Sequence, residues 1–366
     1  MPQTDALGFV PDAPIRCRDF AIGAVGAGFI MADVQLAAYK DAGFPVAAIA
    51  SRTPAHAAEV ARRWGIATVH DTPERLIEDP SVQILDIAFP PDLQPALIRH
   101  ALRQPHIKAI LAQKPLAMNF ADAKALVADA EAAGKVLSVN QNMRYDQSMR
   151  VLKQLLERNA LGRPVIATIE MRAIPHWQPF LAEYDRLTLL NMSIHHLDVL
   201  RFLFGDPLDV YTAVRTDPRT AFPHRDGICA STLRFPGEVM AVSLEDVWAS
   251  PTGEGFESDI YIKWRVEGTE GLAQGTIGWP DYPDGSPSTL RYCAPSTGGK
   301  WVQPTWETRW FPHAFAGVME QLQHALATGS RPALTGADNV KTMALIEAAY
   351  RSAAEGRAVK LSEFGI

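Results

Sequence analysis

Two segments of the chain combine residue types that can move protons or stabilise charge. Lys114 directly follows the apolar run 107–113 and directly precedes Pro115. The segment 190–205 places His195 and His196 among apolar residues in a pattern that is typical of a helix. Histidine titrates near neutral pH, and a lysine ammonium group stabilises developing negative charge. The two segments therefore indicate acid–base chemistry at a site that the fold must assemble.

The spacing within 190–205 distinguishes the two histidines. On a helix, Asn191, His195 and Asp198 fall at positions i, i+4 and i+7 and share one face. His196 instead shares a face with the apolar residues Met192, Val199, Leu200 and Leu203. We therefore interpret His195 as the candidate acid–base residue and His196 as a packed residue. Neighbouring helical residues point about 100° apart, so we expect no metal site from His195, His196 and Asp198.

A glycine pair, Gly26 and Gly28, stands where a predicted strand (19–25) meets a predicted helix that ends before Gly43. A dinucleotide-binding turn requires this context, because glycine permits a tight turn and a close approach of the backbone to a pyrophosphate. The helix start then offers amide donors to the phosphates. Met31 occupies the third small position of the fingerprint and departs from it. The alternative is a plain strand-to-helix turn without a ligand.

The second predicted strand, 46–50, is followed by Ser51 and Arg52 rather than by the carboxylate that NAD-preferring folds usually carry there. A carboxylate binds the ribose hydroxyls and repels a 2′-phosphate, whereas serine and arginine can bind that phosphate. We therefore expect NADP to be slightly preferred over NAD. In the alternative, Arg52 is an ordinary surface residue and the cofactor is NAD.

Lys114 has two interpretations. In a doubly wound sheet the carboxyl ends of the strands face the ligand crevice, which would place Lys114 beside a nicotinamide. Alternatively, the lysine caps the sheet and extends its ammonium group into water. The spacing of the residues alone supports both interpretations equally.

Strands and helices alternate over the first 140 residues. Helix starts are marked at Thr53–Pro54 and Thr72–Pro73, and Asn119 is a predicted helix cap. Such alternation indicates right-handed βαβ units and a parallel sheet. The predicted strands are 19–25, 46–50, 82–89, 107–113 and 136–140, and helices follow each of the first four.

The second half of the chain follows a different pattern. Helices are predicted at about 146–158 and 193–204, with a strand at 165–172 between them. Strand-like runs then succeed one another without helices, which suggests a mostly antiparallel sheet; they are 208–216, 226–235, 238–248, 258–267 and 271–278. The segment 279–300 is rich in Pro, Gly and Ser and is predicted to be a surface loop. Helices at 311–328 and 336–354 close the chain.

These patterns predict an α/β protein with two domains. A length of 366 residues and a hydrophobic fraction of 47% suit two globular domains. The first, over residues 1–140, is a Rossmann-type domain with a doubly wound parallel sheet that binds NAD(P). The second, over residues 141–366, is an α+β domain with a large, open, mostly antiparallel sheet for substrate binding and oligomerisation. The closing helices are expected to pack back on the first domain.

Composition restricts the partners and the compartment. A formal net charge of −6 argues against general nucleic-acid binding, which needs a basic surface. Cys17, Cys229 and Cys293 form no CxxC pair, which argues against a disulfide framework or a zinc site and suits a reducing compartment. The sequence shows no apolar leader and no run of roughly 18 apolar residues, so we expect a cytoplasmic protein that binds no membrane.

Together, the motifs resemble those of the glucose–fructose oxidoreductase/inositol dehydrogenase/MocA family of NAD(P)-dependent sugar and cyclitol dehydrogenases. The resemblance covers nearly the whole chain. It rests on AVGAGFI (24–30), ASRTPAHA (50–57), AQKPLA (112–117), VNQNMRY (139–145), NMSIHHLD (191–198) and the closing run 315–361.

The resemblance implies roles for individual residues. Lys114 matches the lysine of the family's Glu-Lys-Pro motif, with Gln113 in place of the glutamate, and His195 matches the catalytic histidine. Asn191 replaces a substrate-binding aspartate, which keeps a hydrogen-bonding group but loses the charge. The expected substrate-binding residues are Asn191, Arg144, Tyr145, His176 and Trp177, with Asn142 as a weaker candidate. The expected cofactor-binding residues are Gly26, Gly28, Phe29, Ile30, Ser51, Arg52, Pro90, Gln113 and Lys114.

The resemblance implies an oxidoreductase that transfers a hydride between a sugar, cyclitol or related polyol and NADP or NAD. His195 would take the hydroxyl proton and Lys114 would stabilise the alkoxide, with the reverse assignment also open. Two alternatives use the same scaffold: an NAD-recycling glycosidase or isomerase, and a non-catalytic regulator that binds cofactor and sugar. A bare apolar sheet face would be a liability, so we also expect a homodimer or homotetramer through the open sheet of the second domain, as the resemblance implies too.

Overall fold

The computed structural model describes residues 8–173, 179–247, 260–278 and 286–366. Contacts between Cα atoms divide these residues into two compact units. The first unit contains residues 12–145 and 311–343, and the second contains residues 8–11, 146–310 and 344–366. The segment 311–343 thus belongs with the N-terminal part of the chain, while the boundary predicted after residue 140 stays a prediction.

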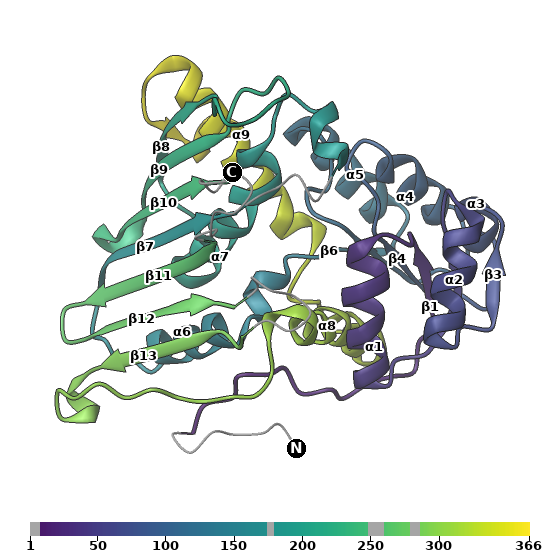
Figure 1. The fold of residues 1–366 in the computed structure, drawn as a ribbon, viewed down its shortest axis with the longest axis horizontal. Helices are drawn as coiled ribbons and strands as arrows, with labels where there is room; N and C mark the ends of the chain where they lie inside the picture. The colour runs from purple at the N-terminus through teal and green to yellow at the C-terminus, as the bar shows by residue number, and fades with distance from the viewer. Residues whose placement is uncertain (1–7, 174–178, 248–259, 279–285) are drawn as a thin grey trace. The chain divides into compact units, whose positions relative to one another are not determined.

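The described residues of the first unit form a six-stranded sheet with the order β3-β2-β1-β4-β5-β6 (Figure 1). All its neighbouring strands are parallel. This order reverses between β1 and β4, as in doubly wound dinucleotide-binding folds, and it confirms the predicted sheet. The strands are β1 (Ile22–Val25), β2 (Val46–Ala50), β3 (Thr68–His70), β4 (Ile84–Ile87), β5 (Ala109–Ala112) and β6 (Val136–Val139).

Helices connect these strands, and most of them begin where the sequence predicts. The side chains of Thr72 and Asn119 accept hydrogen bonds from the backbone amides three residues later. At Thr53 the predicted hydroxyl cap is absent, and the Thr53 backbone amide donates to Ser51 Oγ (3.1 Å). The helices are α1 (Leu36–Ala42), α2 (Pro54–Trp64), α3 (Pro73–Ile77), α4 (Gln94–Leu102), α5 (Phe120–Ala132), α8 (Phe315–Thr328) and the start of α9 (Gly336–Glu355).

The second unit is built on an eight-stranded sheet with the order β13-β12-β11-β7-β10-β9-β8-β14 (Figure 1). Its pairs are antiparallel except for β7 with β10, which confirms the predicted, mostly antiparallel sheet. The strands are β7 (Pro164–Arg172), β8 (Asp209–Arg215), β9 (Ile228–Arg234), β10 (Met240–Asp246), β11 (Tyr261–Gly268), β12 (Leu272–Ile277), β13 (Thr289–Cys293) and β14 (Val359–Lys360).

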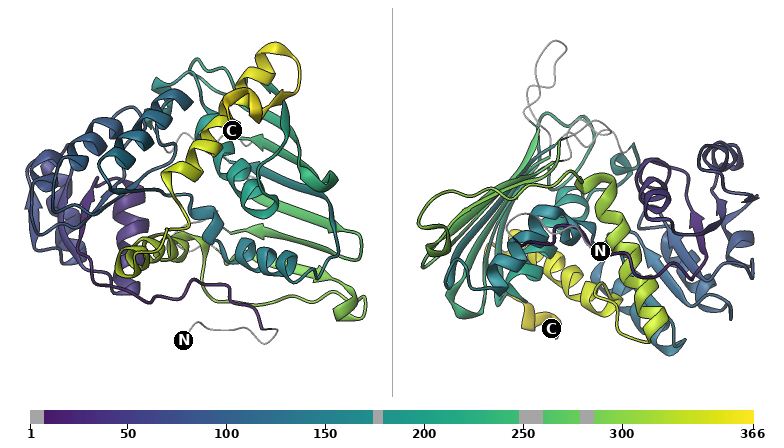
Figure 2. Two further views of the ribbon diagram at one scale, coloured as in Figure 1. Left: turned by 180° about the vertical axis from the view of Figure 1, so that it is seen from behind. Right: turned by 90° about the horizontal axis from the view of Figure 1, so that it is seen from below.

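Among the described residues, helices cover one face of this sheet and leave the other open. Helices α6 (Gln147–Glu157) and α7 (Ile194–Phe204) lie along one face (Figure 2). Alternate residues of β7 follow this division, because Ala167, Ile169 and Met171 are buried while Thr168 and Glu170 are more exposed. The second domain therefore presents an open sheet, as predicted.

Three short strands escaped the sequence prediction. The prediction of a continuous loop over 279–300 is wrong, because β13 lies within this segment and pairs with β12. Its buried Leu290 and Tyr292 alternate with exposed Thr289 and Arg291, but neighbouring Pro, Gly and Ser residues hide that short alternation. The strands β3 and β14 have only three and two residues, which is too short for a periodic pattern.

A buried carboxyl group joins the strand β4 to the first helical segment of the chain. Asp86 on β4 is fully buried and accepts hydrogen bonds from Tyr39 Oη (2.6 Å) and from Gln35 Nε2 (2.7 and 2.8 Å). Burial raises the pKa of Asp86 to about 7. Gln35 Oε1 is buried and has no hydrogen-bond partner within the described residues, so after rotation of the amide it can accept the proton of a neutral Asp86.

This carboxyl group makes the stability of the protein depend on pH. An acid whose pKa is raised by folding favours the folded state at low pH and loses that contribution as the pH rises through the folded-state pKa. Relative to Asp86→Asn, the wild-type protein is expected to lose about 3 kcal/mol of unfolding free energy between about pH 5 and about pH 8. Urea unfolding of both proteins at the two pH values measures this difference. Parallel pH dependences of the two proteins would contradict the assignment.

Candidate active site

The glycine pair at the end of β1 plays two different roles. Gly26 has a φ of +120°, and a Cβ atom there would lie 2.7 Å from the carbonyl oxygen of Ala88. Gly26 is therefore required by the close approach of two chain segments. A Cβ atom on Gly28 would meet nothing within 4 Å, and Gly28 is exposed. The backbone at Gly28 thus leaves open space of the kind that a pyrophosphate group needs.

The helix after Gly28 begins with a wide turn. The amide of Ala32 donates to the carbonyl of Gly28 (2.8 Å), and residues Ile30–Gln35 form a π-helical turn before α1. Met31, at the position of the third small residue of the fingerprint, is fully buried. Phe29 is exposed and its ring lies 6.3 Å from that of Phe311. The turn thus combines a nucleotide-type strand-to-helix junction with a large buried residue in place of the third glycine.

Ser51 and Arg52 follow β2 and differ in what they offer. Ser51 is buried, and its hydroxyl donates to the carbonyl oxygen of Thr53 (2.7 Å). Arg52 is exposed, and its guanidinium lies over the ring of Phe89 at 5.8 Å from the centroid. Arg52 therefore presents a cation at the carboxyl end of β2, while the Ser51 hydroxyl contributes to the local turn.

Lys114 follows the carboxyl end of β5. Its side chain is half-buried, and burial lowers the pKa of Lys114 to about 7. The backbone amide of Lys114 donates to Gln113 Oε1 (3.1 Å), so the residue that replaces the family's glutamate supports the turn. A lysine with a pKa near neutrality can both stabilise an anion as the ammonium and exchange its proton.

The order of the strands brings the predicted cofactor residues of the first unit to one edge of the sheet. The glycine turn follows β1, Arg52 follows β2, Pro90 follows β4 and Lys114 follows β5. These four strands are neighbours in the order β2-β1-β4-β5 and are parallel, so their carboxyl ends lie along the same edge. Ligands of doubly wound folds bind at this edge, where the strand order reverses.

The residues 142–145 occupy a short 3₁₀ turn after β6. Arg144 Nη2 forms an ion pair with Asp338 Oδ2 on α9 (2.7 Å). The ring of Tyr145 packs so closely on Gly317 of α8 that a Cβ atom there would collide with it. Asn142 Nδ2 donates to the carbonyl oxygen of Asn140 (3.3 Å). These residues are held by the first unit, and their predicted role in substrate binding stays a prediction.

His195 and Asn191 lie on a continuous helical segment of the second unit. Asn191 is in a π-helical turn, Leu189–Ser193, and His195 is in α7 directly after it. Both side chains are mostly buried, and the His195 ring meets that of Trp310 edge to face at 5.9 Å. The wider turn changes the angular offset between Asn191 and His195 from the one that α-helical spacing predicts. The predicted loop residues His176 and Trp177 lie outside the described residues.

His196 is buried as predicted, but its partner is polar. The side chains of His196 and Glu245 are both fully buried, and His196 Nδ1 lies 3.0 Å from Glu245 Oε1. Ser243 Oγ donates to the same carboxylate oxygen (2.5 Å). The predicted packing against an apolar stripe is therefore incomplete, because β10 contributes a carboxylate that the helix pattern cannot reveal.

Asp226 holds the start of the helical segment that carries Asn191 and His195. It is fully buried, and its carboxylate accepts the backbone amides of Leu187 (2.8 Å) and Leu189 (2.7 Å) and the hydroxyl of Tyr350 (2.8 Å). Burial raises the pKa of Asp226. The sequence prediction missed this residue, since it lies in a loop between β8 and β9, remote in sequence from the helix that it supports.

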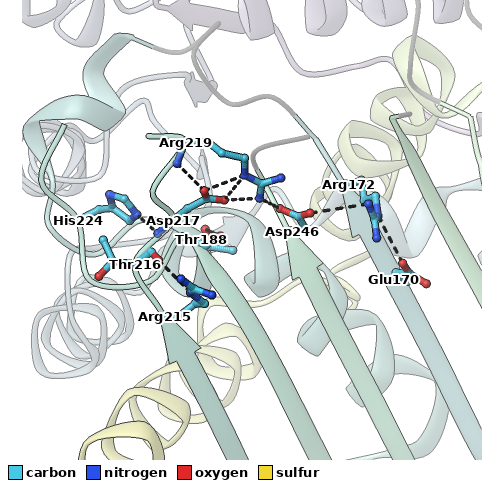
Figure 3. A network of polar contacts seen from close by, with 10 residues as sticks. Glu170, Arg172, Thr188, Arg215, Thr216, Asp217, Arg219, His224 and Asp246 are labelled. Carbon is cyan, nitrogen blue, oxygen red and sulfur yellow. Dashed lines mark hydrogen bonds and ion pairs between the residues drawn. The ribbon is translucent and has the colours of Figure 1, made fainter. Parts of the chain in front are cut away.

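A charged network fixes the loop that carries Asp226 (Figure 3). Arg219 binds Asp217 of the same loop and Asp246 at the carboxyl end of β10. Asp246 also lies 3.9 Å from Arg172 at the end of β7. The backbone amide of Asp217 donates to His224 Nε2 (2.9 Å). The network joins the loop to the ends of two central strands and so restrains the position of Asp226.

The described residues carry few other signs of a ligand site. They contain no group of three or more His, Cys, Asp or Glu side chains placed to hold a metal ion. Cys17, Cys229 and Cys293 are all unbridged. No helix in the described ranges is both long and apolar enough to cross a membrane.

Comparison with known proteins matches both halves of the chain to one family. Residues 20–141 match the oxidoreductase family GFO_IDH_MocA, described as an NAD-binding Rossmann fold, and residues 149–274 match a GFO/IDH/MocA C-terminal domain. A D-apiose dehydrogenase from Rhizobium rhizogenes is 31% identical over 343 residues, which cover 92% of this chain and 96% of that protein. A 1,5-anhydro-D-fructose reductase from Ensifer adhaerens is 27% identical over 347 residues, covering 93% and 98%.

Solved structures show the same fold. An oxidoreductase from Agrobacterium radiobacter, in complex with NAD⁺, L-tartaric acid and magnesium, superimposes with a TM-score of 0.78 and 27% identity, covering 94% of this chain and 99% of that one. An aldose–aldose oxidoreductase from Caulobacter crescentus gives a TM-score of 0.79 at 23% identity, covering 94% and 100%. The fold and the similarity over nearly the whole chain agree with the glycine turn. The protein belongs to the GFO/IDH/MocA family of oxidoreductases with an NAD-binding Rossmann domain.

Proposed function

We propose that the protein is an NAD(P)-dependent dehydrogenase that acts on a hydroxyl group of a sugar, cyclitol or related polyol. The observation that carries the proposal is Lys114, whose pKa is lowered to about 7 at the carboxyl end of β5, on the sheet edge where the glycine turn also lies. A surface lysine that only capped the sheet would be hydrated and would keep its ordinary pKa. The names of the relatives support the substrate class.

The residues of the first unit suit a dinucleotide. Gly28 leaves room for the pyrophosphate, and the amides at the start of the following helix can donate to it. Phe29, Ile30, Pro90 and Gln113 are proposed to line the same site because they adjoin the ends of β1, β4 and β5. When bound, the nicotinamide accepts or donates the hydride. The protein's task is to orient the reacting hydroxyl and to move its proton.

We assign the proton transfer to two side chains. His195 takes the hydroxyl proton as general base, and the Lys114 ammonium stabilises the charge that develops on the substrate oxygen. Asn191 orients a substrate hydroxyl by hydrogen bonding, and Arg144 and Tyr145 contribute to the substrate pocket.

The substrate can be identified with a panel of purified compounds. Two relatives, 31% and 27% identical, are named D-apiose dehydrogenases, so apiose and other pentoses come first, followed by inositols, anhydro sugars and sugar acids. NAD and NADP are tested separately by the absorbance of the reduced nicotinamide. Interconversion or hydrolysis of a sugar without net reduced cofactor would favour the recycling glycosidase or isomerase, and cofactor binding without turnover of any compound would favour the regulator.

Arg52 provides the test of cofactor preference. If its guanidinium binds the 2′-phosphate, Arg52→Ala should raise the Kd of NADPH about 10- to 100-fold, because a charge-assisted hydrogen bond contributes about 1.5–3 kcal/mol. The Kd of NADH should change little, since NADH lacks that phosphate. Fluorescence titration measures both constants, with Arg62→Ala as an exposed control on α2. Equal effects of Arg52→Ala on the two cofactors would favour NAD as the natural cofactor.

We propose that the open face of the eight-stranded sheet mediates a homodimer or homotetramer. The predicted reason was that this face is bare and apolar, but the described part of the face also carries charged side chains. Glu170 and Lys263 stand opposite each other on it beside Arg265, around a hollow of about 660 Å³, while Tyr211 and Met240 add exposed apolar surface. Light scattering at micromolar concentration tests the oligomeric state, and a monomer would contradict the proposal.

A further inference from the structure

The backbone on either side of Lys114 is bound by a single side chain, that of Gln94. Gln94 Nε2 donates to the carbonyl oxygens of Gln113 (2.8 Å), Pro115 (2.7 Å) and Leu116 (3.1 Å). Gln94 Oε1 accepts the backbone amide of Gln113 (3.0 Å). The side chain is fully buried, so these contacts are shielded from water. One carboxamide group therefore holds polar backbone groups before and after the lysine.

The orientation of this carboxamide follows from its partners. Three of its four partners are carbonyl oxygens, which can only accept hydrogen bonds, so the NH₂ group must face them. The remaining partner is an amide N–H, which needs the oxygen. A carboxylate of the same size would direct an acceptor at three acceptors, and an apolar side chain would leave buried backbone groups without partners. Glutamine is thus the side chain whose length and chemistry match this site.

Gln94 also connects Lys114 with the turn after β4. It is the first residue of α4, and its backbone amide donates to the carbonyl oxygen of Pro90 (3.1 Å). The strands β4 and β5 are neighbours in the sheet, and the residues that follow them are among the proposed cofactor contacts. The same residue therefore contacts both turns at this part of the sheet edge.

We propose that Gln94 is a positioning residue that fixes the backbone on both sides of Lys114 and thereby sets the location of its ammonium group. The proposal rests on the catalytic role assigned to Lys114 above. A lysine side chain has four flexible carbon–carbon bonds, so a fixed backbone is needed to hold its nitrogen in a reactive position. A displacement of about 1 Å at a reacting group can cost about 100-fold in rate.

The position of this backbone also decides how well Lys114 is shielded from water. Burial is the cause of its lowered pKa, which is about 7 against an ordinary value of 10.5. If the turn loosens, the ammonium group becomes hydrated and its pKa rises. The proposal thus predicts a change in proton affinity at Lys114 that a general loss of stability elsewhere in the protein would not produce.

The test uses Gln94→Met, which keeps the volume and removes the hydrogen bonds, and Gln94→Glu, which keeps the length and the acceptor. The matched control is Gln323→Met. Gln323 is also fully buried, and its carboxamide also binds one backbone segment. Its Oε1 accepts the backbone amide of Phe20 (3.0 Å), and its Nε2 donates to the carbonyl oxygen of Phe20 (2.7 Å). Either Gln94 variant can carry the test if the other fails to fold.

Two readouts are measured on the full chain. The first is kcat and KM on the substrate found in the panel, where we expect kcat to fall about 100-fold in both Gln94 variants with little change in the Kd of the cofactor. The second is the pH titration of Lys114, followed by NMR after ¹³C-methylation of lysines and assigned with Lys114→Arg. Its apparent pKa should rise from about 7 toward the ordinary lysine value in the Gln94 variants and stay constant in Gln323→Met.

The outcomes separate this inference from the proposed function. Unchanged kcat and an unchanged Lys114 titration in a folded Gln94 variant would overturn the positioning role. So would losses of kcat that match those of Gln323→Met and merely follow Tm. If Lys114→Met keeps its turnover, the catalytic assignment fails instead, while the NMR titration still reports whether Gln94 controls the environment of the lysine.

Discussion

Lys114→Met is expected to lower kcat by about 10³-fold while leaving the Kd of the cofactor within about 2-fold of the wild-type value. Methionine keeps most of the length and volume of the side chain but carries no charge. The substrate oxygen would then develop negative charge without a cation beside it. Removal of such an electrostatic contact raises the free energy of the transition state more than that of the ground state. The loss should therefore appear in kcat rather than in KM.

The same strand offers a matched control for this variant. Lys108 precedes β5 at its amino end and is exposed, with its ammonium over the ring of Phe20, whereas Lys114 follows the carboxyl end. Lys108→Met removes the same charge from the opposite end and should leave kcat unchanged. Steady-state kinetics and fluorescence titration of the cofactor measure both proteins. Near-normal turnover of Lys114→Met would show that the lysine only caps the sheet.

His195→Asn is expected to reduce kcat by about 10²- to 10⁴-fold, the range in which general base catalysis contributes. Asparagine keeps a hydrogen-bonding group near the position of Nδ1 but cannot take up a proton. The remaining activity should increase with pH, because hydroxide and solvent then replace the missing base. The variant loses the ring contact with Trp310, but the helix should stay in place because the segment before it is independently anchored at Asp226.

The kinetic pattern distinguishes His195 from a merely structural histidine. His324 on α8, which is only half-buried, serves as the control, and His324→Asn should retain full activity and a similar Tm. If His195→Asn loses activity in proportion to Tm, or if added imidazole and raised pH restore nothing, the role of general base belongs to another group. In that case the reverse assignment, with Lys114 as the base, becomes the scheme to test.

Much of the fold follows from local patterns in the sequence. The bounds of β2 and the first residue of α2 agree with prediction, because an apolar run and a Thr-Pro start are strong local signals. The glycine turn was also recognisable, since Gly26 must adopt a positive φ at a strand end. Short edge strands such as β13 and β14 were missed, because their pairing depends on a neighbouring strand rather than on their own residues.

The residues of the candidate site likewise divide into those that the sequence could identify and those that it could not. Lys114, His195 and the glycine pair could be named from residue type, spacing and a family resemblance, and their roles stay predictions until the variants are measured. Gln94 and Asp226 could not be identified from the sequence. Glutamine and aspartate are common residues, and no characteristic sequence separation links these two to the groups that they bind. Glu245 likewise escaped notice, although it forms a fully buried pair with the neighbour of the proposed base.

The sequence by itself therefore determined the longer helices and strands, the last strand of the parallel sheet and the side chains that are candidates for chemistry, because periodicity, caps and turn residues act over a few positions along the chain. Only the tertiary structure decided what surrounds those side chains. Gln94 donates hydrogen bonds to the turn of Lys114, and the segment before His195 donates to Asp226. Both contacts join residues that are remote in sequence. Burial, which shifts the pKa of Lys114, is likewise a property of the assembled fold.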